Sequence, residues 1–457
     1  MYTNSRDPTG MYKDRSAVGW DFAPLRELVD PNRRITYGIV QPGEWQEPGN
    51  GVPLIRGQDY SSGDVAIENL RYVHDNIASK YTRSTVKEGD ILLSIVGYVG
   101  LCAIVPKSAE GANITQTTAR VSPSGNIHSG YLAHYFRSQD FKEEVKRYTK
   151  GSAQPGLNLD DVEKMVVRKP QALGEQITIA SILDTLDTQI QKTEALIAKL
   201  EKVKEGLLHD LLTRGIDENG QLRPSPGQAP ELYKESQLGL IPREWKAGYL
   251  IDCVVKASGI KPGPFGSSIT KDSYTEKGFK IYGQEQVISE NQDYGNYFIS
   301  GRKFQELSEF SVKKGDVLIS LVGTIGRSLL IQDGYKEGVI NPRLMRIRVN
   351  CDIALPSFVA ELIKSKPFSR RLVALAGGGT MPVINKGAIS RVAIPLVPLN
   401  EQEEISRRIM SIKNRIYSES HLHSKLLAKK AGLMDDLLTG RVRVTPLLKQ
   451  TQAATPA

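Results

Sequence analysis

The most regular hydrophobic pattern in the chain runs from Glu175 to Thr213. Apolar or tolerated residues recur at alternating steps of four and three, at positions 179, 183, 186, 190, 193, 197, 200, 204, 207 and 211. This spacing is typical of a coiled-coil seam. Neither proline nor glycine interrupts it until Gly206. At ~1.5 Å per residue, the pattern predicts a helix about 58 Å long.

The same pattern returns 226 positions later, from Glu401 to Thr439. Both stretches open with Glu-Gln and close with Asp-Leu-Leu-Thr. Each seam also carries a few polar members, such as Thr193 and Lys204, which can set the register of a coiled coil. Two matched seams in one chain most simply pair with each other, so we expect two long antiparallel helices.

The segments before the two helices also repeat. VKEGDILLSIVGYVG (86–100) matches VKKGDVLISLVGTIG (312–326). The Gly-Asp pair predicts a tight turn, and the apolar β-branched run after it predicts a buried strand. Each half then carries a segment, 131–150 and 358–377, that predicts one short helix. The repeat distance is far longer than that of a solenoid, which indicates a duplicated domain.

The predicted fold is α/β (α+β), with two pseudo-two-fold related globular domains joined by the long antiparallel coiled-coil helices. The predicted boundaries are a leader at 1–17, a first domain at 18–173, a first long helix at 174–213, a linker at 214–232, a second domain at 233–399, a second long helix at 400–440 and a flexible tail at 441–457.

The overall composition agrees with a folded protein, since 40% of the residues are hydrophobic and 24% are charged. A net charge of +9 suits a polyanionic partner, although simple solubility explains it equally well. Three widely spaced cysteines make neither a metal motif nor a disulfide framework, which favours a reducing cytoplasm. We find no signal peptide and no 18-residue apolar run.

Motifs for catalysis are missing from the sequence. The glycines near Gly97 and Gly100 lack the lysine and hydroxyl residue of a phosphate-binding loop. The Asn341-Pro342 pair faintly resembles an adenine methyltransferase loop, but it lacks the aromatic residue that stacks on the base, which favours a structural turn. His421 and His423 point to different sides of a helix and cannot share a metal.

The duplicated layout resembles the specificity subunit of type I restriction-modification systems. The resemblance rests on Tyr-Lys-[Asp/Glu] and tryptophan lead-ins, on Gly-Asp-x-Leu-x-Ser strands at Gly89 and Gly315, and on the Glu-Gln helix openings. The Leu-Leu-Thr-Arg-Gly-Ile-Asp run at 211–217 and Lys-Pro-Gly-Pro-Phe-Gly-Ser at 261–267 add to it. It covers about residues 11–440.

The resemblance implies a noncatalytic, cytoplasmic prokaryotic protein whose two target-recognition domains each read one half of a bipartite double-stranded DNA site. It implies two methyltransferase subunits and restriction/translocase subunits as partners. This chain would bind no cofactor itself, and its partners would use S-adenosylmethionine, ATP and Mg²⁺. Two similar domains on a rigid spacer suit such a task on physical grounds as well.

The candidate DNA contacts are basic, amide, hydroxyl and aromatic residues on loops that do not repeat, because these groups bind phosphates and base edges. They are Arg33, Arg34, Tyr37, Gln41, Lys80, Arg83, Lys150, Ser152 and Gln154 in the first domain, and Lys261, Phe265, Ser267, Ser268, Lys271, Tyr274, Arg302, Lys303, Thr380 and Lys386 in the second. Gln58 and Gln284 align in the repeat and are expected to serve the scaffold.

Two other interpretations stay open at this point. The chain could be the recognition portion of a split or fused restriction-methylation enzyme, or a coiled-coil adaptor without a DNA role. Methyl transfer by the chain alone would favour the first, and a lack of salt-dependent duplex binding would favour the second. The recognised base sequence cannot be read from the residues.

Overall fold

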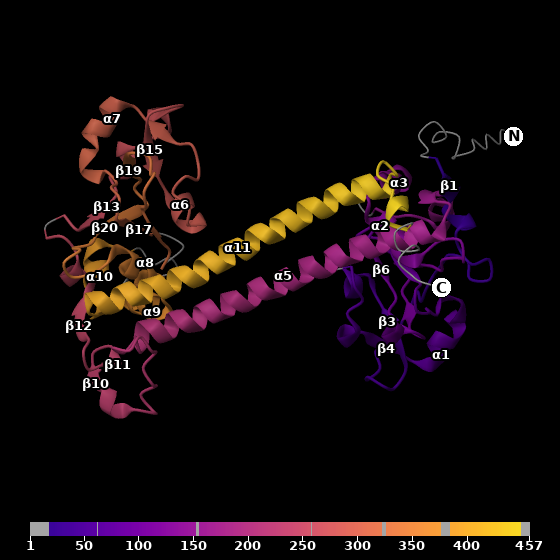
Figure 1. Cartoon of the computed structure of the whole chain (residues 1–457), viewed down its shortest axis with the longest axis horizontal. Helices are drawn as coiled ribbons and strands as arrows, with labels where there is room; N and C mark the ends of the chain where they lie inside the picture. The colour runs from indigo at the N-terminus through magenta and orange to yellow at the C-terminus, as the bar shows by residue number, and fades with distance from the viewer. Residues whose placement is uncertain are drawn as a thin grey trace. The chain divides into compact units, whose positions relative to one another are not determined.

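The computed structural model describes residues 18–61, 63–151, 155–256, 258–321, 326–375 and 384–448. The chain forms two compact units, unit 1 (1–194 and 421–457) and unit 2 (195–420). Two long helices, α5 (Leu173–Thr213) and α11 (Leu399–Leu438), each contribute one half to either unit (Figure 1). The two predicted long helices are therefore confirmed, and each unit is described by itself below.

Unit 1 is built on an antiparallel sheet with the order β2 (Thr36–Tyr37), β8 (Thr118–Val121), β5 (Ile91–Ser94), β6 (Cys102–Ile104). A second sheet has the order β4 (Arg71–Val73), β3 (Val52–Ile55), β7 (Asn113–Ile114), and β1 (Trp20–Pro24) pairs with β9 (Val166–Pro170). The helices of this unit are α1 (Asp75–Ala78), α2 (Ser129–Arg137), α3 (Gln139–Tyr148) and α4 (Leu159–Lys164).

Unit 2 repeats this plan. Its sheets have the orders β13 (Ile260–Pro262), β20 (Leu344–Arg348), β17 (Asp316–Ser320), β18 (Ser328–Leu330) and β14 (Tyr274–Thr275), β16 (Phe298–Ile299), β15 (Phe279–Tyr282), β19 (Gly338–Ile340). β12 (Lys246–Tyr249) pairs with β21 (Ala393–Leu396), and β10 (Tyr233–Ser236) with β11 (Gly239–Pro242). Its helices are α6 (Gln284–Ser289), α7 (Gly301–Glu306), α8 (Pro356–Lys364), α9 (Lys366–Leu375) and α10 (Lys386–Ser390).

The predicted strands and turns of the repeat are observed in both units. β5 and β17 follow the two Gly-Asp turns, and Gly89 and Gly315 adopt positive φ angles of 82° and 85°. A side chain is strained at such angles, so the turn requires glycine. Both strands are completely buried, as their apolar β-branched composition predicts.

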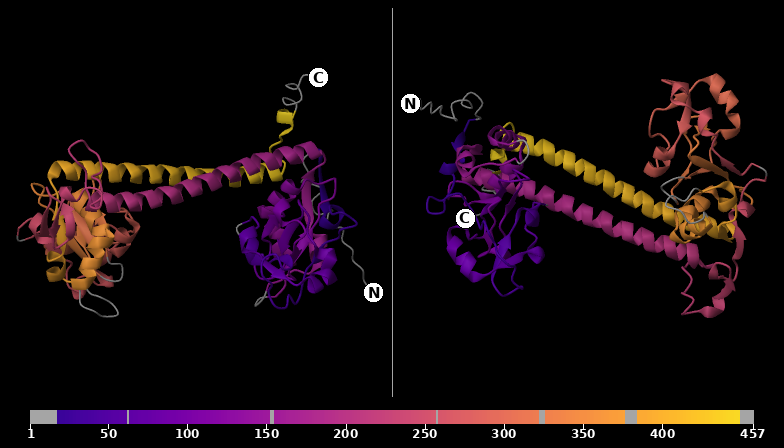
Figure 2. Two further views of the ribbon diagram at one scale, coloured as in Figure 1. Left: turned by 90° about the horizontal axis from the view of Figure 1, so that it is seen from below. Right: turned by 180° about the vertical axis from the view of Figure 1, so that it is seen from behind.

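Within unit 1, the first half of α5 and the last half of α11 run antiparallel. Lys430 forms an ion pair with Asp187, and His423 lies 2.8 Å from Glu194. Within unit 2, Leu211 of α5 and Ile405 of α11 belong to one hydrophobic core. Every predicted seam position is buried or half-buried, as pairing along the predicted seams requires. Figure 2 shows the ribbons of the two helices.

The glutamine of each Glu-Gln opening fastens a long helix to its own unit. Gln176 accepts a hydrogen bond from the backbone N–H of His128 at 2.8 Å and donates to the Pro170 carbonyl at 2.9 Å. Gln402 does the same with the Leu355 N–H and the Val397 carbonyl, at 2.8 and 2.7 Å. Buried glutamine therefore satisfies backbone groups that water cannot reach.

The prediction of one short helix per half is wrong, because each segment is divided in two. Ser138 separates α2 from α3, and Ser365 separates α8 from α9, both with extended backbone. Each serine hydroxyl accepts a hydrogen bond from the N–H of a phenylalanine three residues on, at 3.3 Å for Phe141 and 3.4 Å for Phe368. Serine is a strong N-cap residue, and here it starts a new helix.

Candidate nucleic-acid interface

A buried arginine, Arg120 of β8, links two loops of unit 1. Its guanidinium donates hydrogen bonds to the backbone carbonyls of Arg83 at 2.6 Å, of Thr85 at 3.2 Å and of Arg34 at 3.0 Å. Burial lowers the pKa of Arg120, and the nearby positive charge of Arg33 lowers it further. Arg120 therefore fixes the backbone of the two loops that carry Arg34 and Arg83.

Arg33 is held by its own domain. It forms a two-pronged ion pair with Asp90, in which both N–O distances are 2.7 Å. Asp90 also accepts the backbone N–H of Lys87 at 2.7 Å, which closes the Gly-Asp turn. A two-pronged arginine–carboxylate pair is strong and directional, so Arg33 supports the scaffold whether or not it also contacts DNA.

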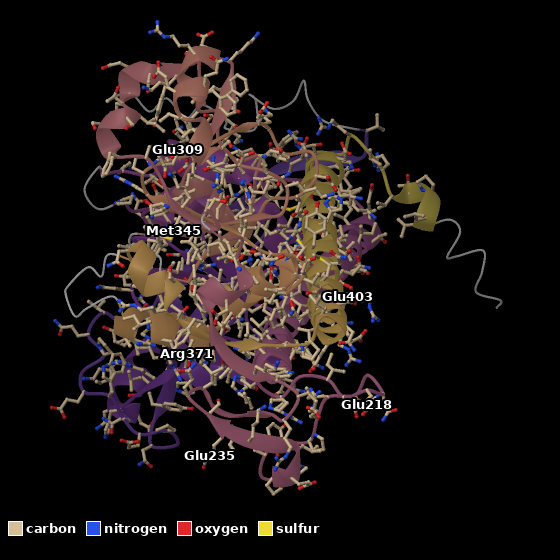
Figure 3. All side chains as sticks on the ribbon, turned by 90° about the vertical axis from the view of Figure 1, so that its left-hand side faces the viewer. Glu218, Glu235, Glu309, Met345, Arg371 and Glu403 are labelled. Carbon is tan, nitrogen blue, oxygen red and sulfur yellow. The ribbon has the colours of Figure 1, made fainter. Side chains whose placement is uncertain are left out.

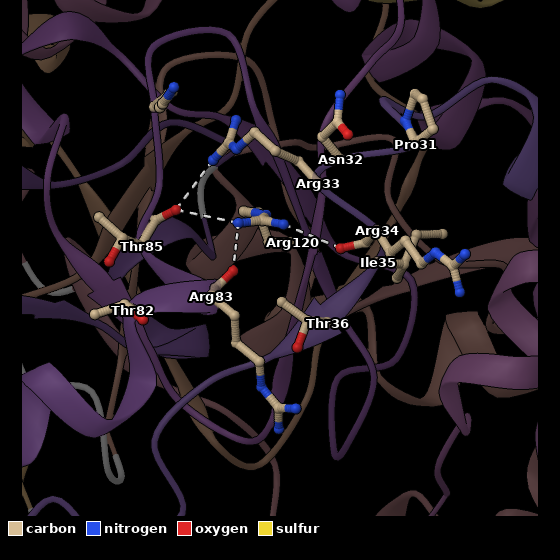
Figure 4. Close-up of a pocket in the computed structure, with 11 residues that line it drawn as sticks. Pro31, Asn32, Arg33, Arg34, Ile35, Thr36, Thr82, Arg83, Thr85 and Arg120 are labelled. Atoms are coloured by element: carbon tan, nitrogen blue, oxygen red, sulfur yellow. Dashed lines mark hydrogen bonds between the residues drawn. The ribbon is translucent and has the colours of Figure 1, made fainter.

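These loops surround a basic pocket, which we define by its lining residues. Its volume is about 640 Å³, and its lining is Pro31, Asn32, Arg33, Arg34, Ile35, Thr36, Thr82, Arg83, Thr85, Lys87 and Arg120. No acidic residue appears among the described residues that line it. Arg34 and Arg83 are exposed, and their guanidinium groups point away from Arg120 (Figure 4). The pocket therefore brings together three predicted DNA contacts, Arg33, Arg34 and Arg83.

Unit 2 keeps the buried arginine but changes what surrounds it. Arg346 of β20 donates to the backbone carbonyls of Glu309 at 3.2 Å and of Ser311. The Lys261 ammonium bonds the Glu309 carboxylate at 2.5 Å and lies over the Phe310 ring. Figure 3 labels Glu309 on this unit. Glu309, which is paired with Lys261, thus stands where unit 1 has the exposed Arg83.

Two more predicted DNA contacts form ion pairs in the same region of unit 2. Lys303 and Arg302, both in α7, lie 3.0 and 3.5 Å from the carboxylate of Glu306. These contacts lower the pKa of Glu306, the hydrogen bond from Lys303 being the largest cause. Glu306 is exposed, so each pair contributes little to stability.

A second cleft lies in unit 2 and has different chemistry. Its volume is about 820 Å³, and it is lined by Gly266, Ile269, Lys271, Tyr274, Ile281, Gln284, Glu285, Tyr294, Gly295, Asn296, Tyr297, Asn341, Pro342 and Arg343. Tyr274 packs against Tyr297 with 5.6 Å between ring centroids. We call it the tyrosine cleft. Aromatic rings, amides and cations together suit contacts with bases and with the DNA backbone.

Of the predicted residues, Lys271 and Tyr274 line the tyrosine cleft, whereas Tyr297, Asn341 and Arg343 were not predicted. The Asn341 carboxamide accepts the Arg343 N–H at 2.9 Å, so the expected structural turn is present. It places the Arg343 side chain on the cleft. The repeat offered no signal for this set, because its members come from separate loops.

The other candidates stay predictions. Phe265 is 88% exposed. Lys150 pairs with Asp161 at 2.9 Å. Tyr37, Gln41, Lys80, Ser267 and Lys386 are exposed and Ser268 is half-buried, while Ser152, Gln154 and Thr380 lie outside the described residues.

Gln284, which was assigned to the scaffold, donates to the Ser320 hydroxyl at 2.6 Å while lining the cleft.

Among the described residues, no group of three or more histidine, cysteine, aspartate or glutamate side chains is placed to hold a metal ion. In the same part of the chain, every helix is too short or too polar to cross a membrane.

Comparison with known proteins adds an independent finding. The family model described as the type I restriction modification DNA specificity domain matches residues 20–202 and again residues 265–428. The two matches fall on the two halves of the internal repeat and together cover most of the chain.

Curated relatives match all or part of the chain. The MjaVIII type I restriction enzyme specificity subunit of Methanocaldococcus jannaschii is 24% identical over 447 residues, which covers 92% of this chain and 97% of the relative. The EcoBI specificity subunit of Escherichia coli is 29% identical over 202 residues, covering 43% of this chain and 42% of the relative.

Solved structures support the fold. A chain from a type I restriction-modification complex superposes with a TM-score of 0.56 at 15% identity, covering 93% of this chain and 99% of that one. The S subunit of a type I system from M. genitalium gives a TM-score of 0.56 at 13% identity, covering 92% and 96%.

Proposed function

Because this chain belongs to the family of type I restriction modification DNA specificity proteins, we propose that it reads a two-part double-stranded DNA target, one half-site with each unit. The unit 1 surface is the basic pocket with Arg34 and Arg83. The unit 2 surface is the tyrosine cleft with Lys271 and Arg343. Reading two different half-sites requires two different surfaces on equivalent scaffolds.

The observation that carries this proposal is the contrast between the buried and exposed parts of the repeat. The buried residues that hold each unit together are kept, as with Gln176 and Gln402, or Arg120 and Arg346. The residues around the two buried arginines differ in charge, since Arg83 lies beside Arg120 and Glu309 lies beside Arg346. A scaffold that is kept while its surface diverges is what two readers of unlike sequences need.

The chemistry belongs to the partners in this proposal. The chain is noncatalytic and directs two methyltransferase subunits and restriction/translocase subunits in the cytoplasm of a prokaryotic cell. Those subunits use S-adenosylmethionine, ATP and Mg²⁺, and this chain binds none of them. The pocket and the cleft supply cations, amides and phenols, which bind DNA through phosphates and base edges.

Genome-wide mapping of methylated adenines, with and without this gene, tests the proposal. The expected result is a set of bipartite methylated sites that vanishes when the gene is deleted. Purified chain without partner subunits should transfer no methyl groups. Methyl transfer by the chain alone would instead support the split or fused enzyme.

A further inference from the structure

We infer that Arg34 and Arg83 bind DNA phosphates in unit 1, and that the equivalent surface of unit 2 makes no such contact. The inference rests on the proposed function, since it concerns how the two units hold their half-sites. Electrostatic binding of the DNA sugar–phosphate backbone on this surface is thereby assigned to unit 1 alone. One segment is equivalent in position in the two units and opposite in charge.

The equivalence is fixed by hydrogen bonds as well as by sequence. Arg120 donates to the carbonyls of residues 83 and 85, and Arg346 donates to those of residues 309 and 311. All three pairs of positions, 120 with 346, 83 with 309 and 85 with 311, are 226 residues apart. The two segments therefore occupy the same place on the scaffold.

The charge of this segment is inverted between the units. Residues 79–84 read Ser-Lys-Tyr-Thr-Arg-Ser, whereas residues 305–310 read Gln-Glu-Leu-Ser-Glu-Phe. Lys80 corresponds to Glu306, and Arg83 corresponds to Glu309. Two cations are thus replaced by two carboxylates. DNA carries one negative charge per ~1.7 Å of its axis, so the first segment attracts it and the second supplies no such attraction.

The two units also differ in whether these charged side chains form ion pairs within the protein. In unit 2, Glu309 is paired with Lys261, and Glu306 with Lys303 and Arg302. In unit 1, Arg34 and Arg83 are exposed, and the basic pocket around them has no carboxylate among its described lining residues. Among the described residues neither guanidinium has an ionic partner, and Arg120 fixes the backbone of both segments, which preorganises these cations for an anion.

A phosphate is the ligand that this arrangement favours over a base edge. The Arg34 and Arg83 guanidinium groups point in different directions from the pocket centre (Figure 4). Lys87 adds a further exposed cation to the lining of the basic pocket. Several cations spread over a surface follow a sugar–phosphate backbone, whereas one guanine needs a single two-pronged arginine.

The test measures affinity against salt concentration for the complete chain assembled with its methyltransferase subunits. The probes are a duplex that carries the mapped target and a scrambled duplex of the same length. The variants are Arg34→Ala, Arg83→Ala and the double variant. Arg26→Ala is the matched control, because Arg26 is an exposed arginine of unit 1 outside the pocket.

Each single variant should reduce the slope of log K against log salt by about 0.9 and weaken binding roughly tenfold near 0.1 M salt, equally on both duplexes. The double variant should reduce the slope by about twice as much. Arg26→Ala and Lys303→Ala should leave the slope unchanged. Arg83→Glu should fold normally, since unit 2 carries glutamate at this position, and should bind more weakly than Arg83→Ala.

Three outcomes would overturn the inference. The first is an unchanged slope for Arg34→Ala and Arg83→Ala, and the second is a loss of affinity on the target duplex alone, which would assign Arg83 to a base edge. The third is a lower slope for Lys303→Ala, which would show that unit 2 also binds phosphate on this surface. Failure of the proposed function is distinguishable, because then the unmodified complex itself would show no salt-dependent binding to either duplex.

Discussion

The indole N–H of Trp245 donates a hydrogen bond to the Glu401 carboxylate at 2.9 Å. The same carboxylate accepts the backbone N–H of Ile216 at 2.7 Å and the Arg223 guanidinium at 2.5 Å, so three donors of unit 2 meet at the start of α11. In unit 1 the corresponding Glu175 pairs with Arg443 at 2.7 Å.

Because of this difference, alanine at Glu401 and alanine at Glu175 should lower the free energy of unfolding by unequal amounts. Glu401→Ala leaves two buried N–H groups unpaired and leaves the buried Arg223 guanidinium with only the Glu244 carboxylate at 3.6 Å and the Arg214 carbonyl at 3.1 Å. Loss of one partner of a buried ion pair costs up to about 3–5 kcal/mol. Glu175→Ala should cost less, because the Arg443 side chain is 30% exposed and can turn to water. Denaturant unfolding measures both variants.

Hydrogen exchange gives a local control for the two alanine variants. The Ile216 amide should exchange faster in Glu401→Ala and at the normal rate in Glu175→Ala, since only Glu401 accepts its N–H. Equal destabilisation by the two variants, with no change at Ile216, would contradict the role given to Glu401.

A pH dependence follows from Asp184 in α5. Its carboxylate lies 2.7 Å from the His134 ring of α2, and this hydrogen bond holds the pKa of Asp184 below its usual value of 3.8. A carboxylate whose pKa is lowered by folding stabilises the protein above the unfolded pKa and loses that effect as pH falls through the folded pKa.

Asp184→Asn keeps an acceptor and removes the charge. We expect it to destabilise unit 1 by about 0.2–1 kcal/mol at pH 6, because the side chain is largely exposed. The difference should vanish as the pH falls through the lowered pKa of Asp184. Unfolding curves at pH 6 and at a pH well below 3.8 measure this. Glu68→Gln, at another exposed carboxylate of unit 1, serves as the control. An equal loss at both pH values would exclude the charge as the cause.

Lys386 and Lys150 differ in their contacts with the described residues, among which only Lys150 has an ion-pair partner. Lys386 is exposed at the start of α10, whereas Lys150 bonds Asp161 at 2.9 Å. If both meet phosphate, alanine at either position should lower the salt slope by about one and weaken binding similarly on cognate and noncognate DNA. Fluorescence anisotropy over a salt series is the measurement, and an unchanged slope would assign them to ordinary surface.

The paired helices predict how the half-sites are spaced. Inserting four residues after Ala195 and four after His421 adds ~6 Å and about 40° of rotation to each helix. The seams on either side keep their pairing, as at a stutter. The gap between half-sites should grow by roughly one or two base pairs, since DNA rises about 3.4 Å per base pair. An unchanged gap with retained activity would mean that the helices do not set the spacing.

The sequence predicted the features that depend on periodicity. The seams, the Gly-Asp turns and the buried strands are local patterns, and they were all found. The division of α2 from α3 was missed, because the apolar spacing continues across Ser138 while its hydroxyl caps the next helix.

The candidate sites were predicted only in part, because they depend on contacts between distant residues. Arg33 looks like a free cation in the sequence, and only the fold brings it to Asp90. Arg120 lies in an apolar strand, where nothing local indicates that it binds the loops of Arg34 and Arg83. Tyr297 and Arg343 meet on the tyrosine cleft from segments that show no common pattern.

Methylation mapping of a domain-exchange variant tests the central claim of two independent readers most directly. Residues 18–172 are replaced by the equivalent segment of another family member, which leaves the helices and unit 2 unchanged. We predict that one half of the methylated target changes and that the other half keeps its bases. A simultaneous change in both halves would contradict the account.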